Sequence, residues 1–207
     1  MALPPDYPEK TNSIRRIAEL RALSFFIPAN SNGNCVGENE IAQLLNELKP
    51  HLREYYRYGN PDGIDPDEPD ETEFYRLPPL VVKRQRCNDF FEVIEGGDRL
   101  VAIYLILTFL DYLFERNLGG PPASPPFILK YETKNRHEEF VRDLKNPFIS
   151  EDPELPQPIR PHPDCLNLFE MWETIENWYF SQKDRFWPVN WATFLKDKTC
   201  FRWHEAQ

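Results

Sequence analysis

The longest uncharged apolar run of the chain extends from Leu100 to Leu110, within the segment 99–117. This run has about half of the roughly 20 residues that a helix needs to cross a bilayer, so we expect no membrane span. Two glycines, Gly119 and Gly120, follow the segment where a helix would stop. Because a helix formed by this segment is apolar on nearly every side, we expect it at the centre of the fold.

Apolar residues at helical spacing predict further helices before and after this central one. The predicted helices cover 11–26, 38–59, 88–95, 135–147, 164–186 and part of the tail 187–207. Two stretches with proline pairs, 77–86 and 121–134, oppose a helix and could pair as a minor two-stranded extended ribbon. The sequence therefore predicts a mainly α fold, an irregular helical domain around the central hydrophobic helix at 99–117.

The prolines of the chain suggest how it is divided. There are 21 of them, about twice the average usage, and they cluster in connecting segments. We interpret 147–163 as a Pro-rich linker between a helical core domain over 1–146 and an aromatic-rich C-terminal helical segment over 164–207. The alternative is that the C-terminal segment belongs to the same domain.

The N-terminal residues and the cysteines both bear on the compartment. Residues 1–10 lack the positive and apolar regions of a signal peptide. The four cysteines are scattered, as expected of reduced thiols and not of a disulfide framework. We therefore expect a soluble, cytoplasmic protein.

The formal net charge of −10 opposes a general role in nucleic-acid binding, because most of the surface would repel phosphates. Only a local basic patch could contact RNA or DNA. Lys83, Arg84 and Arg86 form the densest basic stretch and are the candidate nucleic-acid-binding residues. The same stretch could instead pair with carboxylates or dock an acidic partner.

The C-terminal part of the chain is unusually rich in aromatic residues. All of its tryptophans are candidate partner-binding residues, because aromatic side chains are favoured anchors in protein interfaces. These candidates are Trp172, Trp178, Trp187, Trp191 and Trp203. The alternative is that the rings cover the central helix and complete the core.

Two histidine–cysteine pairs have the spacing of a split metal site. His162 and Cys165 form an H-x2-C pair, and Cys200 and His204 form a C-x3-H pair. Zinc accepts such ligands in two chelating pairs, although the order departs from the common zinc-finger pattern. The alternative, which we favour, is coincidence and no cofactor. Cys165 would then face the core from the first turn of its helix.

The sequence contains no recognised motif of nucleotide binding or of nucleophilic or metal-dependent hydrolysis. No residue is therefore a catalytic candidate, and an enzymatic role is not predicted. The expected function is a non-enzymatic protein–protein interaction subunit, or adaptor, of a cytoplasmic complex. The alternatives are an accessory subunit of a nucleoprotein complex and a zinc-binding or cysteine-dependent protein.

Overall fold

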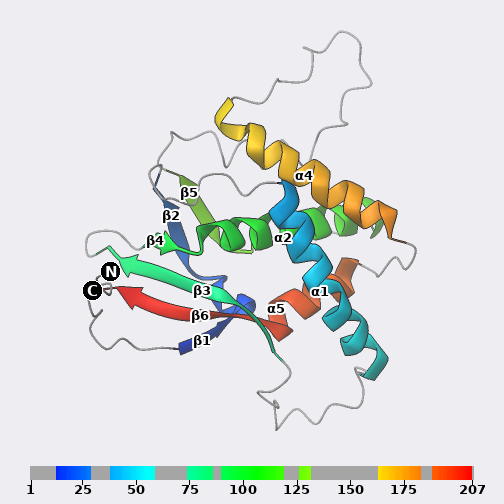
Figure 1. The fold of residues 1–207 in the computed structure, drawn as a ribbon, viewed down its shortest axis with the longest axis horizontal. Helices are drawn as coiled ribbons and strands as arrows, with labels where there is room; N and C mark the ends of the chain where they lie inside the picture. Colours follow the sequence, from blue (N-terminus) through cyan, green and yellow to red (C-terminus); the bar gives the residue numbers. More distant parts are fainter. Residues whose placement is uncertain are drawn as a thin grey trace, which may run out of the picture.

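The computed structural model describes residues 13–28, 38–58, 74–85, 90–118, 126–131, 163–182 and 188–206. The strands are β1 (Ser13–Arg16), β2 (Ser24–Ile27), β3 (Tyr75–Arg84), β4 (Phe91–Glu95), β5 (Ile128–Tyr131) and β6 (Thr199–Ala206). The helices are the 3-10 helix η1 (Ile17–Leu20) and the α-helices α1 (Glu38–Tyr58), α2 (Gly97–Leu118), α4 (Pro163–Ser181) and α5 (Pro188–Lys198). Figure 1 shows the strands gathered on the left of the view and α1, α4 and α5 on the right.

The strands form one six-stranded mixed sheet with the order β1-β6-β3-β4-β2-β5. β1 is antiparallel to β6, and β3 is antiparallel to β4. The pairs β3–β6, β2–β4 and β2–β5 are parallel. The crossover from β4 to β5 therefore runs through α2, with β2 inserted between the two strands. A parallel pair that is joined through a helix is typical of an α/β fold.

The prediction of a mainly α fold is wrong, and so is the description of the protein as α-helical, because the sheet contains six strands. Segment 11–26 was expected to be one helix and contains β1, η1 and β2. Segment 88–95 was also expected to be a helix and contains β4. Both segments carry aromatic or β-branched pairs, Phe25–Phe26 and Val93–Ile94, which pack well on a pleated sheet.

The predicted two-stranded ribbon is also corrected. Its two stretches do contain strands, β3 and β5, but these strands are not neighbours, because β4 and β2 lie between them. The central helix, in contrast, is confirmed as α2, and the side chains from Leu105 to Leu110 are all buried. Figure 1 shows α2 extending from the end of β4 toward the other helices.

The hydrophobic core lies between the helices and one face of the sheet, which we call the inner face. Burial alternates along much of the strands, as expected when the described helices pack against one face only. The inner face contributes a set of buried side chains: Phe25, Leu77, Leu80, Val82, Val93, Leu129, Phe201 and Trp203. They form one cluster with buried residues of α1, α2, α4 and α5.

The C-terminal segment takes part in this core. β6 pairs with β1 on one side and with β3 on the other, so it lies inside the sheet. The position of the predicted linker, 147–163, falls almost wholly outside the described residues. Among the described helices, none combines the length and hydropathy that a bilayer-spanning segment needs.

Candidate interaction surface

The second face of the sheet, which we call the outer face, is the candidate functional surface. Its side chains come from the alternate positions of the strands, which point away from the helices. The apolar members are Ile14, Phe26, Val81, Ile94 and Ile128. The cationic members are Arg16, Arg76, Lys83, Lys130 and Arg202. All five cations are exposed, and the exposed fractions of Ile14, Ile94 and Ile128 are 51%, 47% and 43%.

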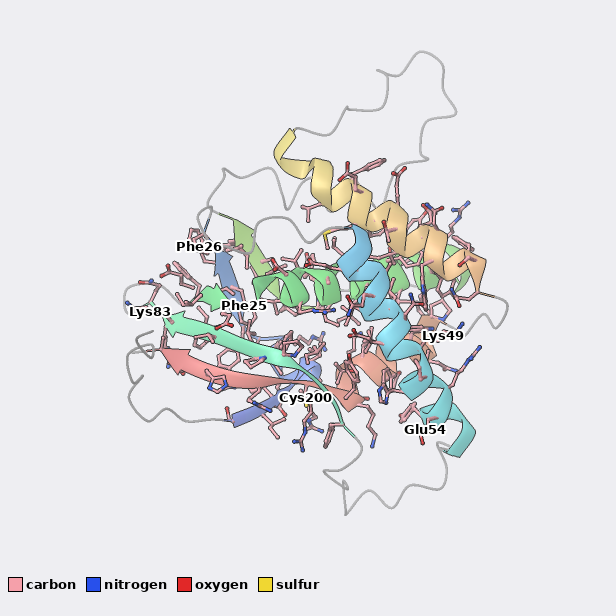
Figure 2. The ribbon with its side chains drawn as sticks, viewed as in Figure 1. Phe25, Phe26, Lys49, Glu54, Lys83 and Cys200 are labelled. Carbon is pink, nitrogen blue, oxygen red and sulfur yellow. The ribbon has the colours of Figure 1, made fainter. Side chains whose placement is uncertain are left out.

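One row of side chains crosses the outer face through four neighbouring strands. Lys83 on β3 lies opposite Glu92 on β4, Glu92 opposite Phe26 on β2, and Phe26 opposite Lys130 on β5. Neighbouring strands lie about 4.8 Å apart, so the backbones of Lys83 and Lys130 are about 14 Å apart. Figure 2 shows Lys83 at the end of β3, and Phe26 on the opposite side of β2 from Phe25.

The middle of this row consists of Phe26 and Glu92, and each has a partner on the surface. The ring centroids of Phe26 and Phe90 are 5.5 Å apart, so the two side chains form a pair on the surface. The Gln85 amide donates a hydrogen bond to Glu92 Oε2. Glu92 is therefore held beside its own strand, between Lys83 and Phe26.

A further apolar side chain of the outer face, Ile94, lies at an irregularity in β4. Val81 pairs with Glu95 and Val82 pairs with Val93, which leaves Ile94 without an opposite residue in β3. Such a β-bulge re-aims side chains locally. Ile94 points to the outer face by ordinary alternation from the buried Val93, and the bulge places Glu95, which pairs with Val81, on the same face.

The charge of the outer face is opposite in sign to that of the whole chain. Its cations outnumber its strand carboxylates, Glu92 and Glu95, whereas the chain has a formal net charge of −10. Arg16 also forms an ion pair with Glu19, with 3.0 Å between Nε and Oε1. The other cations leave a positive field beside the exposed aliphatic side chains. A partner that covers this face therefore needs apolar groups together with negative charge.

The structure divides the predicted basic patch. Lys83 lies on the outer face, but Arg84 is the next residue of β3 and points to the other side, with its guanidinium carbon 5.9 Å from the centroid of the Phe91 ring. Arg86 lies outside the described residues. Sequence reasoning missed Arg76, Lys130 and Arg202, because they meet Lys83 on one face only through strand pairing. The alternation of apolar and polar residues in β6 was the signal that could have identified Arg202.

Most of the candidate partner-binding tryptophans lie in the core. The exposed fractions of Trp172, Trp191 and Trp203 are 3%, 2% and 1%. Trp178 is partly buried, and its indole nitrogen donates a 2.9 Å hydrogen bond to Asn46 Oδ1 on α1. Trp187 lies outside the described residues. This arrangement corresponds to the alternative in which the rings complete the core.

The structure describes the side chains of only one of the two histidine–cysteine pairs, and that pair is not placed as a metal site. Cys200 and His204 both lie in β6, where residues four apart are about 13 Å apart, too far for their side chains to share one zinc ion. His162 lies outside the described residues, and only the backbone of Cys165 is described. In the described ranges, no three histidine, cysteine, aspartate or glutamate side chains are placed to hold a metal. Burial raises the pKa of the Cys200 thiol, which disfavours the reactive thiolate.

A second polar group of side chains lies between β3 and α1. The Tyr75 hydroxyl donates a 3.1 Å hydrogen bond to Glu47 Oε2, and the His51 ring lies 4.9 Å from the Tyr75 ring. Burial and the neighbouring Glu47 carboxylate raise the pKa of Tyr75 to about 12. Tyr75 therefore stays protonated near neutral pH. We interpret this contact as a link between sheet and helix and not as an acid–base site.

No protein-family model, curated protein or solved structure matches the chain, so the function is inferred from the geometry of the outer face.

Proposed function

We propose that the protein is a non-enzymatic interaction subunit, or adaptor, and that it binds its partner through the outer face of the sheet. The observation that carries this proposal is the outer face, which none of the described helices covers and which combines exposed aliphatic and cationic side chains. Three of the five strand pairs are parallel, and parallel strands are usually covered on both faces, whereas antiparallel strands often leave one face in water. The apolar side chains on the neighbouring strands β4, β2 and β5 mark a candidate interaction site. A partner would supply the missing layer.

Two substitutions with closely similar starting exposure test the proposal. Ile128 on the outer face and Val189 on α5 have exposed fractions of 43% and 44%. We expect Ile128→Glu to remove the proteins that copurify with the tagged chain, because it places a charge in the contact, and Val189→Glu to retain them. Circular dichroism would establish that both variants are folded. If the Ile128→Glu variant still retains the copurifying proteins, or if both variants lose them equally, the proposal is overturned.

A nucleic-acid-contacting accessory subunit is a second candidate, because Arg76, Lys83, Lys130 and Arg202 lie on the same face as the Phe26–Phe90 pair. Cations that follow the backbone and aromatic rings that stack on bases are the means by which proteins bind single strands. This candidate predicts binding of a single-stranded oligonucleotide that weakens steeply as salt rises. Binding without salt dependence, or no binding, would remove it.

We propose the cytoplasm as the compartment, where the free thiol of Cys200 would stay reduced. The proposed interaction needs no cofactor, because its contacts are side chains of the sheet. Metal analysis of the purified protein tests the zinc alternative directly. A stoichiometric zinc content that survives dialysis would favour a metal protein over this proposal.

A further inference from the structure

We infer that the partner covers the outer face with an acidic amphipathic helix, whose apolar stripe lies over Phe26 and whose flanks carry Asp and Glu. This inference rests on the proposed function, and it specifies the chemistry of the partner. The occupant is a helix of another protein, and its features follow from the apolar side chains, the spacing of the cations and the charge of the face.

The apolar side chains of the outer face require an apolar stripe on the partner helix. Phe26 of the row pairs with Phe90, which comes just before β4, and Ile94 lies farther along β4 in the bulge. An apolar sheet face is normally buried against a helix or a second sheet, since those are the layers that close a fold. Three side chains along two neighbouring strands match the stripe of one helix that runs along those strands.

The spacing of the lysines then fixes the width of the occupant. Lys83 and Lys130 lie on opposite sides of Phe26, with backbones about 14 Å apart. A helix with its side chains is about 10–12 Å wide, so one helix seated between β4 and β2, beside Phe26, would have one lysine along each flank. Both lysines are exposed and could reach carboxylates on those flanks.

The charge argues against a nucleic acid as the favoured occupant. A polyanion would be repelled by a chain of net charge −10 before it reached the sheet, whereas a short acidic helix carries only a few carboxylates. Beyond the Phe26–Phe90 pair, the exposed apolar side chains Ile14, Ile94 and Ile128 are aliphatic, so they add nothing to a platform on which bases could stack. Glu92 lies under the apolar stripe and not under a flank, and one of its carboxylate oxygens accepts a hydrogen bond from the Gln85 amide.

Designed helical peptides are the probe. One peptide carries a leucine stripe flanked by glutamates. A second peptide has lysines in place of the glutamates, and a third has serines in place of the leucines. Fluorescence anisotropy would measure the binding of each peptide, and of a single-stranded oligonucleotide, to the full chain. The matched variants are Lys83→Glu/Lys130→Glu on the outer face and Arg53→Glu/Arg116→Glu on exposed positions of α1 and α2, which change the net charge equally.

We expect the glutamate–leucine peptide alone to bind, with an affinity about tenfold weaker in the outer-face variant and unchanged in the helix variant. Equal binding of the lysine–leucine peptide, or equal weakening in both variants, would overturn the inference. Binding of the oligonucleotide in place of the peptide would also overturn it. If the glutamate–leucine peptide does not bind while Ile128→Glu still removes the copurifying partner, the inference about the helix is wrong and the proposed function is supported. If Ile128→Glu also leaves the copurifying partner in place, both the inference and the proposed function are wrong.

Discussion

At the scale of single residues, Tyr75 makes stability depend on pH. Its pKa is about 12 in the folded chain, because of burial and the Glu47 carboxylate, against an ordinary value of 10.0. The folded state therefore holds the phenol proton more tightly than the unfolded state does. The stabilising contribution is complete below pH 10.0 and is lost as the pH rises through about 12.

This shift predicts a difference between the wild type and Tyr75→Phe. Between pH 10.0 and about 12, the free energy of unfolding of the wild type should fall more steeply than that of the variant, which has no phenol to titrate. Urea unfolding at a series of pH values measures both slopes. Parallel curves would show that Tyr75 titrates normally.

Gly96 is the residue where the backbone itself sets a requirement. Its φ is +81°, and an added Cβ would lie 2.5 Å from the carbonyl oxygen of Pro79. We expect Gly96→Ala to lower the free energy of unfolding by about 2 kcal/mol or more, because the positive φ and the contact both oppose a side chain. The control is Gly97→Ala, where the nearest atom to a Cβ is a Val93 methyl carbon at 3.4 Å. Equal thermal stability of the two variants would contradict this account.

At the scale of elements, α4 packs on α2 through Trp172. The ring centroid of Trp172 is 5.4 Å from that of Phe109 and 6.0 Å from that of Tyr112. We expect Trp172→Ala to lower the free energy of unfolding by about 3–5 kcal/mol, the usual cost of removing a buried tryptophan. Glu173→Ala, at the exposed position beside it, should change stability by less than about 0.5 kcal/mol. Denaturant unfolding compares them. If Trp172→Ala keeps the stability of the wild type but loses partner binding, Trp172 belongs to an interface and not to the core.

The long helices could be predicted from the sequence, and the short strands could not. α1 and α2 are each more than twenty residues long, so the apolar pattern of each repeats over several turns. β1, β2 and β5 have four residues each, which is too short to distinguish strand alternation from helical spacing. The strand character of β2 comes from burial of Phe25 among distant residues such as Trp203, and local sequence does not contain that information.

At the scale of the whole molecule, the last strand holds the sheet together. β6 lies between β1 and β3 and contributes Phe201 and Trp203 to the core. We predict that a chain ending at Lys198 does not fold cooperatively, because β1 and β3 lose their shared partner. A chain that lacks only Gln207 is the control. Circular dichroism during thermal unfolding compares the two, and a cooperative transition in the shorter chain would contradict the prediction.

The candidate surface was less predictable than the helices, because strand pairing across the whole fold brings its residues together. Lys83 was identified from the sequence as part of a basic stretch, but its partners on the outer face are Arg202 and Lys130, which are distant in the sequence. They reach one face only because β6, β3, β4, β2 and β5 pair in that order. The order depends on nonlocal packing, so a local pattern such as the alternation in β6 could identify a single member of the surface but not the surface as a whole.

The most direct test of the account is lysine labelling of the protein, first isolated and then in complex with its copurified partner, with reactivity measured by mass spectrometry. Lys83 and Lys130 on the outer face should react readily in the isolated protein and be protected in the complex, while Lys196 on α5 keeps the same reactivity in both. If Lys83 and Lys130 are equally reactive in both states, or are already unreactive in the isolated protein, the outer face is not the partner-binding surface.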